Sequence, residues 1–498
     1  MSKFILAIDQ GTTGTTACLT DLSTLRFLGK VGLEFPQIFP RPGWVEHDLG
    51  DIWHCTEKVV RELLKNHGVA SRDIACIGIT NQRETVGAFT REGVPLGHAI
   101  VWQDRRTGEF CEELKSSKAA KDITRKTGLA IDSYFSGSKI KWLLENDTRV
   151  QKAKEKGDLL FGTIDTFLLY KLSGGKAYKT EGSNASRTML YDIEKGKWDR
   201  DFLDIFCVGE DELPEVCDSF TLFGKTEGLS FLPDGIPITG ILGDQQAALF
   251  GQGGVGEGEM KCTYGTGGFL LLNTGTKKID SQNGLLSTVA YRHEGQNRFA
   301  LEGSCYVAGA AVQWLRDKLG FFESSKQIEE LSKGVQDILE MEFVTFLPFF
   351  TGTASPYWCS EAKAAIVGLT RDTGKPHIAR ACLDGVALSI EDVISTFKKD
   401  LDQEIPALKV DGGMCQNDLF CQIQANVSEI IIKRPQVIET TSYGACLAAA
   451  IGLGEKTFQD VENSSSTYEE FAPNDEKDFY RKKKLLWDGL IQRLYLSK

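Results

Sequence analysis

A carboxylate followed by a run of glycines and threonines stands near the start of the chain, where residues 8–16 read IDQGTTGTT. The apolar FILAI before it predicts a strand that ends at Asp9. A tight Gly/Thr turn points several backbone N–H groups at one spot and binds anions, phosphate above all, and the hydroxyls of Thr12 and Thr13 add donors. Asp9 would repel a bare phosphate, whereas Mg²⁺ between the two would satisfy both. An ordinary hairpin with glycine at its corner is the alternative.

A second carboxylate and a second Gly/Thr turn lie near the middle of the chain. Asp244 follows the strand-like IPITGIL and opens a segment of helical period, DQQAALFG. A carboxylate at such a strand end is well placed to accept a proton from a hydroxyl nucleophile, although a helix N-cap would favour aspartate there as well. The turn TYGTGG (263–268) follows shortly afterwards and repeats the pattern of the first turn.

Side chains suited to a small polyol follow another predicted strand, in ITNQRETVGAF. Arg83 can donate to one hydroxyl while Glu84 accepts from its neighbour, but adjacent residues of this kind more often form a surface ion pair. Trp102 and Phe269 offer apolar walls for a carbon chain, or they simply fill a core. In KVDGGMCQND (409–418) a predicted strand ends in Asp-Gly-Gly, where small residues would let a flat base and ribose approach the backbone; a plain turn is the alternative.

Several other phosphate and metal motifs are excluded by their context. GQGGVG (251–256) matches GxGxxG, but it follows a helical pattern and leads into a strand, the reverse of a dinucleotide fold. GKT (224–226) lacks the glycine that a P-loop requires, so a P-loop enzyme is excluded. No HExxH occurs among the six histidines, which argues against a zinc hydrolase.

The elements that must position these residues alternate between strand-like and helical segments, which predicts an α/β architecture. A chain of 498 residues is too long for one core, so we expect two domains, 1–250 and 251–498, divided near the glycine-rich GQGGVGEGE. MKCTYGTGGFLLLNTG repeats the strand, turn and strand of FILAIDQGTTGTTACLTD. Two such hairpins, one in each half, could face each other across a cleft, although glycine turns often resemble one another by chance.

Composition and charge narrow the function classes further. A net charge of -12 leaves no excess of basic side chains for a nucleic-acid backbone, so nucleic acid is not an expected partner. Thirteen cysteines scattered through apolar segments are typical of reduced thiols in a cytosol. MSKFILAID is too short for a signal peptide, and no run of eighteen apolar residues occurs. We therefore expect a cytoplasmic protein without a membrane segment.

Taken together and in order, these segments resemble the FGGY carbohydrate kinases, in particular the branch that acts on glycerol, within the wider actin, hexokinase and heat-shock chaperone superfamily. YFSGSKIKWLLEN (134–146) and AAIVGLTRDTGKPHIARACLD (364–384) are similar to the two signature stretches of the family. AIDQGTT, NQRET, GWVEHD, GDQQAALFGQ, TYGTGGF and VDGG extend the resemblance over nearly the whole chain.

The resemblance implies two ribonuclease-H-like domains that flank an active-site cleft, and Mg-ATP-dependent phosphorylation of glycerol to sn-glycerol 3-phosphate. It implies that Asp244 is the general base and that Asp9 holds the metal. It assigns glycerol to Arg83, Glu84, Tyr134, Asp244 and Gln245, with Trp102 and Phe269 against the carbons. It assigns ATP or ADP to Thr12, Thr13, Gly14, Thr266, Gly309, Gln313, Gly413 and Asn417. The same resemblance implies a homo-oligomer, a dimer or a tetramer.

Two departures from the family pattern carry expectations of their own. Many relatives have arginine at the position of Thr16, so a contact to the nucleotide phosphates is in doubt here. The stretch EGLSFLPDGIP (227–237) contains no Arg or Lys, which predicts insensitivity to fructose 1,6-bisphosphate. A kinase for another small polyol or ketose, and a nucleotide-dependent switch that binds a protein as actin or the chaperones do, are the alternative functions.

Overall fold

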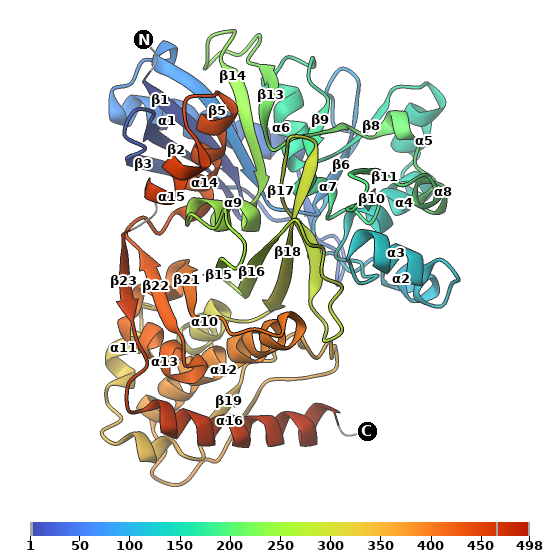
Figure 1. Ribbon diagram of the computed structural model, residues 1–498. Coiled ribbons are helices and arrows are strands. Elements are labelled where there is room, and N and C mark those ends of the chain that lie inside the picture. The colour runs from blue at the N-terminus through green and yellow to red at the C-terminus, as the bar shows by residue number, and fades with distance from the viewer. Residues whose placement is uncertain (1–2, 465–466, 497–498) are drawn as a thin grey trace.

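The computed structural model describes residues 3–464 and 467–496. Two mixed β-sheets, each flanked by helices, lie one above the other in Figure 1. The strand order is β13-β14-β5-β1-β2-β3 in the first sheet and β17-β18-β16-β15-β21-β22-β23 in the second. In each sheet, the strand before the Gly/Thr turn pairs antiparallel with the strand after the turn and parallel with its other neighbour. The expectation of an α/β protein with two similar halves is confirmed.

The first sheet presents buried apolar side chains on both faces. Its strands are β1 (Phe4–Gln10), β2 (Gly14–Asp21), β3 (Phe27–Glu34), β5 (Ile74–Asn81), β13 (Phe220–Lys225) and β14 (Pro237–Gly243). Leu6 and Ile8 pack with helix α1 (Leu49–His67), whereas Ile5 and Ala7 pack with helix α14 (Thr440–Gly452). Helices on both faces explain why the FILAI run is apolar throughout instead of alternating.

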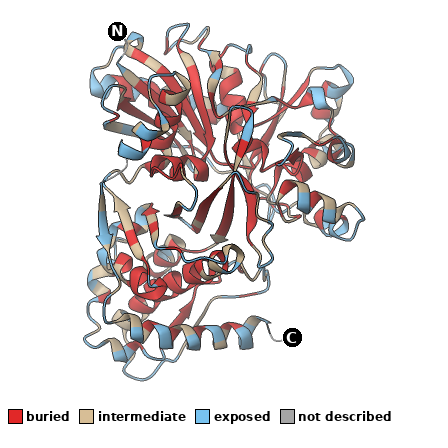
Figure 2. Ribbon diagram, viewed as in Figure 1, coloured by how far each residue is buried: buried red, intermediate tan, exposed pale blue. Residues whose placement is uncertain are grey.

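The second sheet has the helices of the C-terminal region against it. Its strands are β15 (Met260–Tyr264), β16 (Gly268–Gly275), β17 (Leu286–His293), β18 (Gln296–Cys305), β21 (Ala407–Asp411), β22 (Ile431–Pro435) and β23 (Tyr468–Phe471). The helices are α10 (Gly309–Asp317), α11 (Gln327–Ser332), α12 (Lys375–Leu401), α13 (Asp418–Ser428) and α16 (Lys477–Ile491). Helix α12 runs through the largest core cluster and is buried over most of its length, as the red ribbon in Figure 2 shows.

Helix α14 belongs to the end of the sequence, yet it packs on the first sheet beside helix α9 (Asp244–Gly251). The contact is backbone to backbone. A Cβ added to Gly78 would lie 2.1 Å from the carbonyl oxygen of Ala445, and one added to Gly240 would lie 2.3 Å from the amide nitrogen of Ala449. Only glycine at these two positions of the first sheet permits this approach. A larger residue at either position would push α14 off the sheet.

The remaining elements lie around the two large sheets. A four-stranded sheet contains β4 (Glu46–His47), β6 (Val86–Thr90), β7 (Ala99–Ile100) and β8 (Leu159–Thr163). The further helices are α2 (Gly108–Lys115), α3 (Ala120–Thr127), α4 (Ser136–Asn146), α5 (Thr148–Glu155), α6 (Ile164–Leu172), α7 (Gly182–Ala185), α8 (Arg200–Phe206) and α15 (Phe458–Ser464). Short strand pairs are β9 (Lys179–Glu181) with β12 (Glu215–Cys217), β10 (Tyr191–Asp192) with β11 (Lys197–Trp198), and β19 (Thr345–Leu347) with β20 (Ala365–Val367). Within residues 3–464 and 467–496, no helix combines the length and apolar character needed to cross a bilayer.

A buried carboxyl on α12 makes the stability of the fold depend on pH. Glu391 accepts a hydrogen bond from Ser395, but its second carboxyl oxygen has no hydrogen-bond partner among the described residues, and burial raises its pKa from 4.5 to about 7. The folded state therefore holds this proton at pH values where the unfolded chain releases it. The resulting stabilisation is present in full below about pH 4.5 and is lost as the pH rises towards 7.

We expect Glu391→Gln to remove this dependence, because the amide stays neutral at every pH. Between about pH 5 and pH 8, the free energy of unfolding of the wild type should fall by about 2 kcal/mol more than that of the variant. Urea unfolding at a series of pH values measures the difference. Parallel profiles for the two proteins would show that Glu391 is already ionised in the folded state.

Candidate active site

The carboxyl ends of three adjacent parallel strands bring the predicted chemistry to one edge of the first sheet. Gln10 at the end of β1 pairs with Asn81 at the end of β5, and Asn81 pairs with Gly243 at the end of β14. Asp9, Arg83 and Asp244 therefore emerge side by side, although they are far apart in the sequence. In open α/β sheets this edge is where ligands bind.

Asp244 and Arg83 are in direct contact. The Nε atom of Arg83 lies 3.1 Å from Oδ1 of Asp244, which also accepts a hydrogen bond from the amide of Gln245 at 2.7 Å. Asp244 is the first residue of α9, and Gly243 occupies the cap position, so the aspartate is not the N-cap that its sequence position also suggested. Its carboxylate is 29% exposed beside an almost fully buried guanidinium, which leaves it open to a ligand from one side.

Glu84 is held in a strained backbone conformation. Its φ of 63° lies in the left-handed region, which non-glycine residues rarely occupy, and the turn is closed by the amide of Thr85 donating to the carbonyl of Arg83. The side chain is 1% exposed and pairs with the Nε atom of Arg187. Strain of this kind persists where the surroundings fix it, often at functional sites. Arg83 and Glu84 do not form the exposed ion pair that was the alternative.

A carboxylate from the second sheet completes this charged cluster. Glu302 on β18 accepts hydrogen bonds from both terminal nitrogens of Arg83, at 2.5 and 3.1 Å, and from Arg187 at 2.9 Å. Burial alone would raise the pKa of Glu302, but the two guanidiniums outweigh burial and hold it at about 2. The Nη1 atom of Arg187 is buried and has no hydrogen-bond partner within residues 3–464 and 467–496. Because Arg83 follows β5 of the first sheet, this cluster ties the two sheets together beside Asp244.

Two aromatic rings lie between the buried charged cluster and the first Gly/Thr turn. Trp102 meets Tyr134 edge to face, with ring centroids 5.6 Å apart, and its indole N–H donates to the hydroxyl of Thr12 at 2.9 Å. The ring of Tyr134 also lies 5.7 Å from the guanidinium carbon of Arg187. Burial raises the pKa of Tyr134, so its phenol stays protonated and available as a donor. One contact chain therefore joins the turn to the buried cluster.

Gln245 and Phe269 are linked by a buried lysine that sequence reasoning did not find. Lys261 on β15 donates to the side-chain oxygen of Gln245, to Thr263 at 2.8 Å and to the carbonyl of Phe269 at 3.4 Å. Burial lowers the pKa of Lys261, and the nearby carboxylate of Asp411 opposes that shift. The lysine thus connects a residue at the edge of the first sheet to the second Gly/Thr turn.

Asp9 has the surroundings expected of a metal ligand. It accepts a hydrogen bond from Ser442 of α14 at 2.8 Å, and burial raises its pKa to about 7, with Asp244 and Glu439 adding to the rise. Carboxylate oxygens that repel one another are the donors Mg²⁺ prefers. Among the residues that the structure describes, no group of three or more His, Cys, Asp or Glu side chains is arranged around a metal position. A single carboxylate such as Asp9 suits an ion that is held mainly by phosphates and water.

The five nucleotide-binding predictions that fall in the second half line one cavity of about 680 Å³ at the carboxyl ends of β15 and β21. These residues are Thr266, Gly309, Gln313, Gly413 and Asn417. Asn417 also caps α13, because its side-chain oxygen accepts from the amide of Phe420 at 2.8 Å. Thr12, Thr13 and Gly14 do not line this cavity; they form the turn between β1 and β2, next to Asp9.

Gly309 fixes the width of this cavity at one end. Its amide donates to the carbonyl of Gly265, and a Cβ at position 309 would lie 2.6 Å from that oxygen. We expect Gly309→Ala to push α10 away from the second Gly/Thr turn and to weaken ADP binding about tenfold, as for a lost contact of 1.4 kcal/mol. Calorimetric titration with ADP measures the change.

The matched control is Gly256→Ala, because a Cβ there meets no atom within 4 Å. This variant should bind ADP as the wild type does. If Gly309→Ala and the control bound ADP with equal affinity, the turn and α10 could move apart without any loss of binding free energy.

The residues that the sequence did not single out, Arg187, Lys261, Glu302 and Ser442, share one property: each is buried and polar. Glu302 alone carried a readable signal, because it interrupts the otherwise apolar and small run FALEGSC. A lone carboxylate inside a strand of this kind requires a buried partner. The sequence does not identify that partner, since Arg83 and Arg187 lie in distant segments.

Family models match most of the chain. The N-terminal domain of the FGGY family of carbohydrate kinases matches residues 4–251, and the C-terminal domain of the same family matches residues 260–453. The glycerol kinase of Bdellovibrio bacteriovorus is 50% identical over 456 residues, which cover 91% of each chain. The glycerol kinase of Myxococcus xanthus is 46% identical over the same share.

Solved structures agree with these sequence relatives. The crystal structure of Plasmodium falciparum glycerol kinase with ADP superposes with a TM-score of 0.90 at 34% identity, covering 99% of this chain and 98% of that one. A ligand-bound xylulose kinase from Lactobacillus acidophilus superposes with a TM-score of 0.87 at 21% identity, a likeness of fold alone.

Proposed function

Because the chain belongs to the FGGY family of carbohydrate kinases, we propose that it transfers the terminal phosphoryl group of Mg-ATP to glycerol and releases sn-glycerol 3-phosphate and ADP. The observation that carries the proposal is the contact between Asp244 and Arg83 at the strand ends of the first sheet. It sets a carboxylate that can accept a proton beside a donor that can hold a hydroxyl.

In this mechanism glycerol is held by its hydroxyls against Arg83 and Glu84, whose side chains the buried cluster already fixes in place. Pre-positioned partners reduce the entropy lost when substrate and catalytic group are brought together. Trp102 and Phe269 pack against the carbon chain, and Tyr134 donates from its protonated phenol. Asp244 then orients the reacting hydroxyl and accepts its proton.

The nucleotide is proposed to place its base and ribose in the cavity of the second sheet and its phosphates at the two Gly/Thr turns. Asp9 would hold Mg²⁺, which neutralises charge on the phosphates when bound. The amides of residues 12–14 donate to the phosphate oxygens, whereas the amide of Gly11 closes the turn by donating to the carbonyl of Gly14 at 2.9 Å. Phosphoryl transfer has a loose transition state, so positioning and charge neutralisation supply most of the rate.

The deciding experiment is an ADP-release assay on the purified protein with glycerol, with xylulose and with no acceptor. The proposal requires ADP release that depends on glycerol and on Mg²⁺. Release that depends on xylulose instead would assign a different sugar or polyol. Slow release that no acceptor increases would favour a nucleotide-dependent switch of the actin kind.

The connection between β13 and β14 predicts how the enzyme responds to fructose 1,6-bisphosphate. Residues 227–237 contain no Arg or Lys, and a bisphosphate without cationic partners binds poorly. We therefore expect unchanged glycerol phosphorylation when fructose 1,6-bisphosphate is added up to about millimolar concentration. Even a dissociation constant of about 1 mM would require only about 4 kcal/mol of binding free energy. A saturating inhibition curve in this range would contradict the prediction.

The same proposal places the enzyme in the cytoplasm. All thirteen cysteines are free thiols, ten of them buried, as suits a reducing compartment. The family resemblance further predicts a dimer or a tetramer, which sedimentation velocity would distinguish from a monomer.

A further inference from the structure

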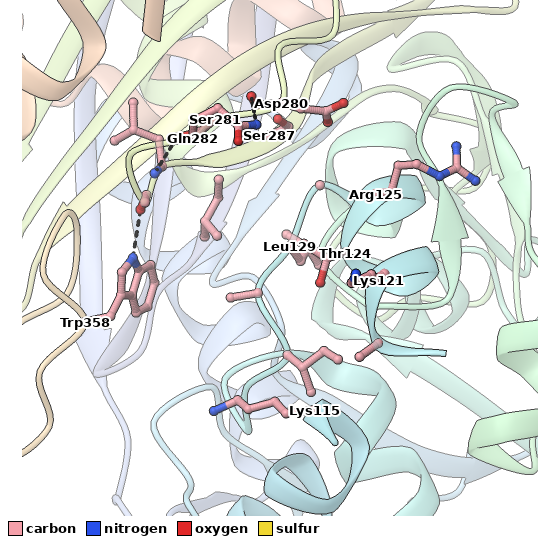
Figure 3. A pocket seen from close by; sticks show the side chains of 17 residues that line it. Lys115, Lys121, Thr124, Arg125, Leu129, Asp280, Ser281, Gln282, Ser287 and Trp358 are labelled. Atoms are coloured by element: carbon pink, nitrogen blue, oxygen red, sulfur yellow. Dashed lines mark hydrogen bonds between the residues drawn. The ribbon is translucent and has the colours of Figure 1, made fainter. Parts of the chain in front are cut away.

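A cavity of about 650 Å³ lies outside the site described above, between two segments that belong to opposite family domains. One wall comes from α2, α3 and the chain after them; the other comes from the loop before β17 and from Trp358 (Figure 3). The volume is that of a site for a small organic molecule. Neither the acceptor residues nor the nucleotide residues line it.

The wall on α2 and α3 is strongly basic in a chain whose net charge is -12. Between Lys115 and Thr127 the sequence has five Lys or Arg residues and one Asp. Lys121 is exposed and makes no ion pair or side-chain hydrogen bond within the described residues, and Lys115 pairs only with the exposed Glu112. Such an exposed pair is worth little and yields readily to a ligand anion.

The start of α3 also suits a phosphate at this wall. Ala119 precedes the helix and has no side chain that could cap it, so the N-terminal amides beyond that of Ala120, which donates to the carbonyl of Ser117, add to the positive charge. The one acid of the first turn, Asp122, is neutralised by its pairs with Arg125 and Lys126. Arg125 points its guanidinium away from Trp358 in Figure 3 and pairs with Asp122, so we do not count it as a ligand. The carboxylate of Asp280 on the facing wall is paired with Lys278 at 2.7 Å, which reduces its repulsion of an anion.

The facing wall also presents an aromatic and apolar surface, beside the polar residues 280–282. Trp358 is 38% exposed, and its indole N–H is fixed by a hydrogen bond to the carbonyl of Gly284 at 2.8 Å. Its backbone φ of 49° is left-handed, an unusual conformation for a large side chain. Buried Leu129 and Leu285 lie deeper in the cavity. A planar or apolar body would stack against the indole while its charged end meets the lysines.

The cavity is one strand pairing away from the charged cluster of the active site. Leu286 lines the cavity and is the direct cross-strand partner of Glu302. The next residue, Ser287, donates its amide to the carbonyl of Gly128 in the opposite wall at 2.9 Å. A ligand that contacts both walls would therefore favour the close approach of the two domains. The ion pairs between Arg83 and Glu302 favour the same approach.

We propose that this cavity is a regulatory site for a small organic phosphate with a planar or apolar body, and that its occupation strengthens glycerol binding. The phosphate is held by Lys115, Lys121 and the first turn of α3, and the body packs on Trp358. The effect on glycerol rests on the proposed function, whereas the binding does not.

Binding is tested with naphthyl phosphate by calorimetry in the presence of saturating ADP, which blocks the nucleotide cavity. Lys115→Glu and Lys121→Glu should each weaken binding about tenfold, as expected for a lost charge-assisted contact. The control is Lys118→Glu, because Lys118 is exposed in the connection between α2 and α3 and does not line the cavity; it should change binding by about twofold or less. Absence of binding, equal binding of uncharged naphthol, or equal effects of all three variants would overturn the proposal.

The kinetic arm measures the KM of glycerol at saturating ATP. Bound naphthyl phosphate should lower it about fivefold in the wild type and leave it unchanged in Lys121→Glu. An unchanged or raised KM with the probe bound would overturn the regulatory role. A protein that releases no ADP with glycerol would instead refute the proposed function, while the calorimetry would still decide on the site.

Discussion

Asp244→Asn should lower the turnover of glycerol about a thousandfold, because an amide cannot accept the proton of the attacking hydroxyl. The substitution is nearly isosteric, and the side-chain oxygen can still accept from Arg83 and from the amide of Gln245. The affinity for ADP should remain close to that of the wild type, since the nucleotide cavity lies at the second sheet. Steady-state ADP release and ADP titration measure the two quantities separately.

A suitable control is Asp201→Asn, which removes a carboxylate that is 81% exposed on α8. It should retain full turnover. Near-normal turnover of Asp244→Asn would remove the base assignment, and loss of ADP binding together with turnover would indicate a general disturbance of the first sheet.

Glu302→Gln should have the largest effect on stability, because it leaves two buried guanidiniums facing a neutral amide. Breaking a buried ion pair in this way costs about 3–5 kcal/mol of unfolding free energy. The pKa of Glu302 is about 2 in the folded protein and 4.5 in the unfolded chain. The carboxylate therefore contributes in full to the free energy of unfolding at neutral pH, and this contribution is lost only as the pH falls from about 4.5 towards 2. The KM of glycerol should rise as well, since Arg83 loses its bidentate partner.

Glu470→Gln offers the matched comparison, because Glu470 is 53% exposed and pairs with Lys433 at 3.2 Å on the surface. Its effect on the free energy of unfolding should be about 1 kcal/mol or less. Urea unfolding of both variants tests the contrast. If Glu302→Gln were as stable as the surface variant, water or a backbone shift would have to satisfy Arg83 and Arg187.

The sequence predicted those parts of the fold and site that local patterns encode. The FILAI strand, the Gly/Thr turn after it and the repeat at 260–275 are found as β1 with β2 and β15 with β16, because strand runs and glycine turns are properties of neighbouring residues. The resemblance to a family placed Arg83, Asp244 and the nucleotide residues, which no local pattern brings together.

The buried charges could not be predicted, because their partners are set by sheet pairing over long distances in the chain. Arg187 follows a four-residue helix and resembles any surface arginine in sequence, yet it is fully buried against Glu84 and Glu302. Lys261 lies in a strand where lysine would ordinarily face solvent. Both are identified only once β15 and β18 are placed beside the first sheet.

Helix α14 also constrains the order in which the chain folds during synthesis. The face of the first sheet that carries Ile5 and Ala7 is complete only when residues 440–452 have been made. While the ribosome extends the chain, that apolar face stays uncovered, and nascent proteins in this state are the usual clients of chaperones. Docking of α14 also brings Ser442 to Asp9, so this contact to the end of β1 forms only after residue 442 has been made.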